Sequence, residues 1–153
     1  MYQSTSPENA VKVIKSNDRA FVQMGAAAPQ TLIKAMSARF EELRNVEVWH
    51  LHTEGVAPYA HPDLRDSFHV NSFFVGSNIR HTLTAGNGSY TPVFFSELPY
   101  LFKNRVLNID VALIQVSVPD KHGYCSLGVT IGETLAAIDN AKHVIAQINP
   151  KMP

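Results

Sequence analysis

The chain has one cysteine, Cys125, among its 153 residues. A single cysteine excludes a disulfide bond within the chain and a zinc site built from several cysteines, and it fits a reducing compartment. The sequence also has no run of about 18 apolar residues that could span a membrane. Residues 1–6 lack the basic cluster and apolar stretch of a secretory signal. We therefore expect a soluble, cytoplasmic protein without a membrane partner.

An excess of charge of either sign is also absent, because 13 lysines and arginines balance 13 aspartates and glutamates. Proteins that bind nucleic acid concentrate positive charge on one surface, so nucleic acid is not an expected partner. Neither the P-loop pattern nor the glycine pattern of a dinucleotide-binding fold occurs. With 45% apolar residues, the chain is long enough for one domain with a buried core.

Short apolar segments alternate with a helical pattern. The apolar run at residues 20–24 ends at Gly25 and predicts a buried strand, and residues 46–51 predict the next one. Between them a helix is expected to begin at Pro29, with an apolar stripe at spacings of three and four. The stripe consists of Leu32, Ile33, Met36, Phe40 and Leu43. This order requires crossovers between parallel strands.

The clearest strand lies at residues 110–117, because a nearly unbroken apolar run is typical of a parallel strand covered on both faces. Further strands are expected at residues 90–95 and 144–148, with a helix over residues 131–141. The predicted fold class is α/β, with an open, mostly parallel sheet and helices on both faces.

Ligands bind such sheets outside the carboxyl ends of the strands, so the loops after the predicted strands are the candidate site. The first loop combines Gly25 with Ala26, Ala27 and Ala28. These small residues would let a ligand oxygen approach main-chain N–H groups near a helix start. A close-packed turn is the alternative explanation.

The second loop contains His52, Thr53, Glu54 and Gly55. The Glu54 carboxylate could act as base, nucleophile or hydrogen-bond acceptor for a substrate, or it could only bind loop backbone. His50 and His52 share a strand face, but a zinc site needs three or four ligands at fixed geometry, and no helical histidine pair supports one. We interpret the histidines as polar lining and expect no metal.

The third loop, residues 119–123, has a structural explanation. The side chain of Asp120 can close its own turn and Gly123 supplies a positive φ, so we favour a turn over a binding role. Cys125 has no sequence neighbour that would activate its thiol, and a buried, small apolar role is expected for it.

Longer segments resemble the acetyl-CoA hydrolase/transferase family, and the likeness covers nearly the whole chain. The strongest is the strand Asp110-Val111-Ala112-Leu113 and its continuation to residue 128. The other segments are residues 46–55 with Ala57-Pro58-Tyr59, residues 71–80, Tyr90-Thr91-Pro92 with Ser96-Glu97-Leu98-Pro99, and residues 141–150. The 4-hydroxybutyrate CoA-transferase type looks most similar.

The resemblance implies a CoA-transferase-like fold built from two similar α/β domains, of which residues 1–153 would be the N-terminal one. Members transfer CoA to acetate, butyrate, succinate, propionate or 4-hydroxybutyrate. A glutamate of the second domain attacks the acyl-CoA thioester, and the resulting anhydride becomes a glutamyl-CoA thioester that the acceptor carboxylate resolves. Water as the acceptor would make the enzyme a hydrolase.

The motif with this glutamate has no match here, and Glu54 belongs to a different block. We therefore expect no catalytic residue in this chain and no activity from it alone. Coenzyme A would be a substrate rather than a permanently bound cofactor. Expected partners are the C-terminal domain of the same enzyme and further copies in a homo-oligomer. The residues expected to line the acyl pocket are Gly25, Ala26, Ala27, His52, Thr53, Glu54, Gly55, Asn71 and Arg80.

Two other hypotheses remain open. The chain could be a stand-alone acyl- or CoA-binding or regulatory module without catalysis. It could also be a complete enzyme that uses Glu54 or His52 on a sugar phosphate, which fold analogy alone supports.

Overall fold

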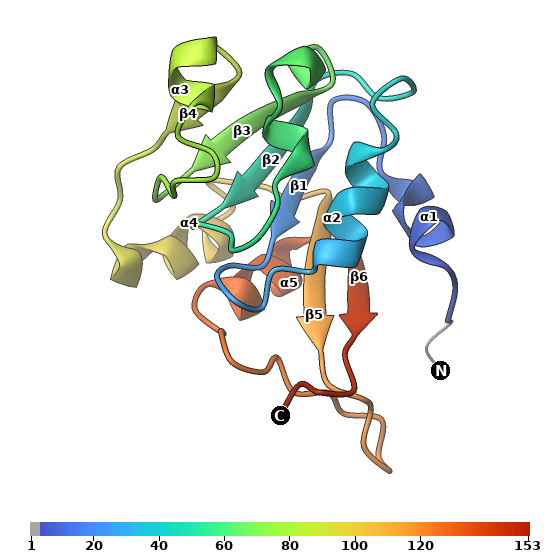
Figure 1. The fold of residues 1–153 in the computed structure, drawn as a ribbon. Helices are drawn as coiled ribbons and strands as arrows, with labels where there is room; N and C mark the ends of the chain where they lie inside the picture. The colour runs from blue at the N-terminus through green and yellow to red at the C-terminus, as the bar shows by residue number, and fades with distance from the viewer. Residues whose placement is uncertain (1–3) are drawn as a thin grey trace.

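The computed structural model describes residues 4–153. A parallel sheet of six strands forms its centre, in the order β4-β3-β2-β1-β5-β6 (Figure 1). All five strand pairs are parallel, which confirms the predicted fold class. The strands are β1 (Arg19–Val22), β2 (Val46–His50), β3 (Phe68–Ser72), β4 (Gly88–Tyr90), β5 (Val111–Val116) and β6 (His143–Ile148).

The helices connect these strands. They are α1 (Pro7–Ala10), α2 (Gln30–Ser37), α3 (Thr82–Ala85), α4 (Leu98–Lys103) and α5 (Thr134–Asn140), with short 3-10 helices η1 (Val11–Val13), η2 (Pro58–Ala60), η3 (Pro62–Leu64) and η4 (Phe95–Glu97). The hydroxyl of Ser6 caps α1 by accepting a hydrogen bond from the Asn9 N–H at 3.3 Å.

Alternate residues of β1 supply two apolar layers. Ala20 and Val22 face α2 and η1, whereas Phe21 faces α4 and α5. All six residues of β5 are buried, as expected for a strand covered on both faces. The helices therefore lie on both sides of the sheet (Figure 1).

Two predicted elements are shorter in the structure. The helix after Pro29 ends at Ser37, and Phe40 is exposed because the following residues form tight turns. The guanidinium of Arg39 holds these turns by donating to the carbonyls of Val11 and Ile14.

The strand predicted at residues 90–95 was wrong in position as well as length, since β4 is Gly88–Tyr90 and shares only Tyr90 with the prediction. β4 is an edge strand, and the ladder continues only through the Thr91 N–H, which donates to Ser72 O at 2.9 Å. Pro92 then has no N–H to extend it.

Cys125 is exposed, so the expected buried role is wrong. It lies in the long connection between β5 and α5, outside the apolar layers. Among residues 4–153, no helix has both the length and the apolar character needed to cross a membrane.

Candidate functional site

The chain leaves neighbouring strands β1 and β5 toward opposite faces of the sheet. β1 continues into α2 on one face, and β5 continues through residues 117–133 into α5 on the other. Such a divergence between adjacent parallel strands is where open α/β sheets bind ligands. The carboxyl ends of β1 and β5, with the loop after β2 beside them, therefore define the candidate site.

The loops after β1 and β2 are joined at Gly25 and Thr53, which form an isolated parallel bridge. The Gly25 N–H donates to His52 O at 2.8 Å, and the Glu54 N–H donates to Gly25 O at 3.3 Å. Gly25 has a φ of 59°, a left-handed conformation that glycine adopts without strain. The structure thus brings together the two loops that the sequence singled out.

The free main-chain donors lie one and two residues beyond Gly25. The Gly25 N–H is occupied by His52 O, whereas the structure gives the N–H groups of Ala26 and Ala27 no partner within residues 4–153. Ala26 is exposed and Ala27 is buried. An exposed amide beside a strand end can receive a substrate oxygen.

The side chains of His52 and Glu54 reach solvent, with 32% and 68% of their surface exposed. The Nε2 of His52 lies 3.7 Å from Glu54 Oε1, so the two form an ion pair only when His52 is protonated. The His52 ring also packs edge-on against Phe74, with 5.6 Å between centroids. Both side chains are therefore accessible at the surface of the candidate site.

Two amide side chains that the sequence analysis did not select fix the second loop. The Nδ2 of Asn78 donates to Thr53 O at 3.0 Å and to Gly55 O at 3.2 Å. The Nε2 of Gln30 donates to Glu54 O at 2.7 Å. The sequence carries no local signal for these bonds, because their partners are 23 to 25 residues away.

The structure does not bring Asn71 or Arg80 to these loops. Asn71 pairs with Trp49 on the sheet and lines a separate hollow with Glu47 and His69. Arg80 is exposed in the turn before α3. A role for either residue in substrate binding stays a prediction.

His50 ends β2 and is completely buried. Neither ring nitrogen has a hydrogen-bond partner among the described residues. Burial first, and the neighbouring His52 second, lower the pKa of His50 to about 4. The ring is therefore neutral at pH 7, and it lies under the second loop next to Tyr59, whose hydroxyl is 3.4 Å from Thr53 Oγ1.

Glu133 is another buried group, and neither of its carboxyl oxygens has a hydrogen-bond partner among residues 4–153. It is the N-cap residue of α5, three and four residues before Ala136 and Ala137, which pack in the layer between α5 and the sheet. The adjacent Gly132 lies against Met24, close to the end of β1. Burial raises the pKa of Glu133 to about 7.

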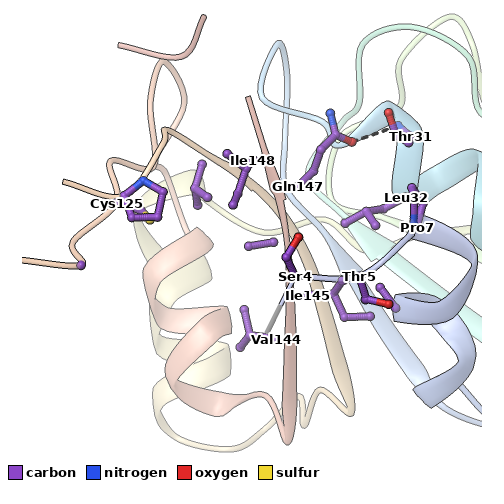
Figure 2. A pocket seen from close by; sticks show the side chains of 15 residues that line it. Ser4, Thr5, Pro7, Thr31, Leu32, Cys125, Val144, Ile145, Gln147 and Ile148 are labelled. Atoms are coloured by element: carbon purple, nitrogen blue, oxygen red, sulfur yellow. Dashed lines mark hydrogen bonds between the residues drawn. The ribbon is translucent and has the colours of Figure 1, made fainter. Parts of the chain in front are cut away.

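A hollow of about 740 Å³ lies beside β6 rather than at the Gly25–Thr53 bridge (Figure 2). Its wall includes Thr31 at the start of α2, whose N–H donates to Gln147 Oε1 at 3.0 Å. Cys125 lies at the opposite side of this hollow (Figure 2). Neither His52 nor Glu54 lines it.

The side chain of Asp120 closes its own turn, as the sequence predicted. The Oδ1 atom of Asp120 accepts from the N–H groups of His122 and Tyr124 at 2.8 and 2.9 Å, and Gly123 has a φ of 86°. This carboxylate is occupied by its own loop, which argues against a ligand role. Within residues 4–153, no three His, Cys, Asp or Glu side chains are grouped to hold a metal.

The sequence is similar to those of several CoA transferases. It is 42% identical over 142 residues to a succinyl-CoA:acetate/propanoyl-CoA:succinate CoA transferase of Fasciola hepatica, covering 92% of this chain and 29% of that protein. It is 39% identical over 146 residues to the 4-hydroxybutyrate coenzyme A transferase of Clostridium kluyveri, covering 95% and 34%. The chain thus spans about a third of the length of these relatives.

Solved structures of related proteins have the same fold. RipA from Yersinia pestis superimposes with a TM-score of 0.90 at 29% identity, covering 97% of this chain and 37% of RipA. The 4-hydroxybutyrate CoA-transferase of Porphyromonas gingivalis gives a TM-score of 0.78 at 32% identity, covering 97% and 34%. Residues 1–153 match the acetyl-CoA hydrolase/transferase N-terminal domain over their whole length, and the chain belongs to that family.

Proposed function

We propose that this chain is the N-terminal domain of a CoA-transferase that moves CoA between an acyl-CoA such as acetyl-CoA and a small carboxylate such as 4-hydroxybutyrate, butyrate or acetate. The observation that carries the proposal is the family match across residues 1–153. The two linked loops at the carboxyl edge of the parallel sheet support the proposal, because open α/β sheets bind ligands at that edge.

The chain's own contribution is to bind and orient the acyl group. The N–H group of the exposed residue Ala26 is the donor available to an oxygen that gains negative charge during acyl transfer. Protonated His52 would add a positive charge beside Glu54 at the same edge. Gly25 holds both loops together, so these groups keep a fixed spacing.

The nucleophile is proposed to come from a second domain, as a glutamate that passes through a glutamyl-CoA thioester. Glu54 is 68% exposed, and among residues 4–153 its carboxylate lies within ion-pair distance of His52 alone, so the described structure supplies no group that would activate it as a nucleophile. In this proposal the second domain, as the partner of this chain, closes over the carboxyl edge and excludes water, which favours the carboxylate acceptor over hydrolysis.

The test is acetyl-CoA turnover with 4-hydroxybutyrate, butyrate, propionate and succinate as acceptors. The chain is assayed alone and mixed with the part of the Clostridium kluyveri enzyme that lies beyond the matched segment. Transfer only in the mixture supports the proposal. In the mixture Glu54→Gln should lower turnover without abolishing it, because the proposed nucleophile lies in the second domain, and Glu97→Gln, at an exposed glutamate away from the loops, is the matched control.

Turnover by the chain alone that Glu54→Gln abolishes would refute the proposal and make Glu54 the nucleophile. Acyl-CoA binding without turnover in any mixture would instead favour a stand-alone binding module.

A further inference from the structure

The side chain of Gln23 takes the place of a main-chain carbonyl in the sheet. In the parallel ladder of β1 and β5, Val22 pairs with Leu113, and the Gln23 N–H donates to Leu113 O at 3.0 Å. The next rung would join the Gln115 N–H to the main-chain oxygen of Gln23. That N–H donates instead to Gln23 Oε1, at 2.7 Å.

Because the side-chain oxygen of Gln23 replaces its main-chain oxygen in the ladder, the main chain of β1 can leave the sheet one residue early. β1 can turn away at Met24 and Gly25 while β5 still finds a partner for its Gln115 N–H. One side chain therefore completes the ladder at the point where β1 and β5 diverge and the candidate site opens. Gln23 is completely buried, so water cannot replace its hydrogen bonds.

The side-chain amide of Gln23 also binds the connection between β5 and α5, on the other side of the site. The Nε2 of Gln23 donates to Leu127 O at 3.1 Å and to Thr130 O at 2.9 Å. Thr130 is also the nearest side chain to Gly25, 3.5 Å from the position that a Cβ there would occupy. All hydrogen-bonding groups of the Gln23 amide are thus used across the gap between the two loops.

Two further glutamines continue the chain of amides to α2. The Nε2 of Gln115 faces Ala27 O at 3.4 Å, and its Oε1 accepts from Gln147 Nε2 at 3.0 Å. Gln147 Oε1 in turn accepts from the Thr31 N–H, as described above. Each of these side-chain amides has one permitted orientation, because exchanging its nitrogen and oxygen would place one N–H donor against another.

We propose that Gln23 is a positioning residue of the candidate acyl site, assisted by Gln115. It sets the departure of the Met24–Ala28 loop from the sheet and holds Thr130 against Gly25, so that the exposed residue Ala26 presents its N–H group at the substrate edge. The structural role of Gln23 rests on geometry alone, whereas the effect of Gln23 on turnover rests on the proposed function.

The test compares Gln23→Met, which removes every side-chain hydrogen bond, with Gln23→Glu. A glutamate keeps the acceptor for the Gln115 N–H. When ionised it has no donor and places negative charge against the carbonyls of Leu127 and Thr130, whereas the protonated form regains one donor. Ser37→Ala is the control, since it removes a buried hydrogen bond to Ile33 O away from the site.

The readout is hydrogen exchange of main-chain amides, expressed as protection against wild type at the same pH. In Gln23→Met the amides of Gly25 and Ala28 should lose about tenfold or more in protection, while Val70 in β3 changes less. Gln23→Glu should show the same local loss at pH 8 and regain protection at pH 5. Ser37→Ala should lower protection without singling out Gly25 and Ala28.

Equal losses at Gly25 and Val70 in Gln23→Met, or a Gln23→Glu pattern that does not change with pH, would overturn the proposal. If Gln23→Met does not fold, the Gln23→Glu series between pH 5 and 8 decides the question alone. In the reconstituted transferase, Gln23→Met should lower kcat about tenfold or more with little change in the KM for acyl-CoA. An inactive wild-type mixture would count against the proposed function only, because the exchange data stand without turnover.

Discussion

The buried carboxyl group of Glu133 makes the free energy of unfolding depend on pH, and replacing it with glutamine should remove that dependence. Burial raises its pKa from 4.5 to about 7, so the folded state holds this proton more tightly than the unfolded chain. Stability from this group is complete below about pH 4.5 and is lost as the pH rises through about 7. At about 1.4 kcal/mol for each pH unit, the loss is about 3 kcal/mol by pH 8.

His50 acts in the opposite direction. Its pKa is lowered from 6.5 to about 4, so the folded state holds its proton less tightly, and stability from His50 is lost as the pH falls from about 6.5 through about 4. Between about pH 4.5 and 6.5 the two dependences oppose each other. The wild-type protein should therefore show little change in stability from these two groups over this range.

Glu133→Gln keeps the size and hydrogen-bonding ability of the neutral acid but cannot ionise. We expect the variant to match wild type near pH 4 and to exceed it by about 3 kcal/mol at pH 8. Between them, its stability should rise with pH, because the dependence from His50 is no longer opposed.

The assay is urea unfolding followed by circular dichroism at several pH values, with Glu97→Gln as the control for an exposed glutamate. The control should stay within about 0.5 kcal/mol of wild type throughout. A stability difference between Glu133→Gln and wild type that is the same at pH 4 and pH 8 would refute the reasoning. So would a variant that is less stable than wild type at pH 8.

Three further outcomes are expected. Asp120→Ala removes the acceptor of two loop N–H groups and should raise hydrogen exchange at His122 and Tyr124 about tenfold, whereas unchanged rates would contradict the turn assignment. Gly25→Ala should lower the free energy of unfolding by about 1 kcal/mol in urea titrations, because alanine is strained at its φ of 59°. Ile148→Lys, on the exposed face of edge strand β6, should reduce concentration-dependent association in light scattering if that edge drives self-association, and an unchanged profile would exclude the edge.

The sheet could be predicted because its strands carry local signals. The unbroken apolar run that became β5 indicated burial on both faces, and the intervening helical stripe required parallel crossovers. The end of α2 could not be predicted, since the turns after it are held by Arg39, whose guanidinium donates to carbonyls 25 and 28 residues earlier in the chain. β4 was misplaced because pairing at a sheet edge depends on its neighbour β3 rather than on its own composition.

The candidate site was predictable as loops but not as a network. Gly25 and the 52–55 loop follow neighbouring strands, so their meeting follows from the parallel order. Gln23 and Glu133 gave no signal, because the partners of one lie about a hundred residues away and the burial of the other depends on helix packing. Whether the loop residues bind substrate stays a prediction.

The central position of β1 also has a consequence for the order of folding. One edge of β1 pairs with β2, and side-chain contacts between them join residues 28 apart. Its other edge pairs with β5, which comes much later in the chain: the contact between Arg19 and Asp110 joins residues 91 apart. At ordinary rates of translation a ribosome needs about 5 to 20 seconds to add that many residues. A nascent chain can thus assemble β1, β2 and β3 with one side of the sheet open, and the loop gap held by Gln23 forms only after β5 emerges.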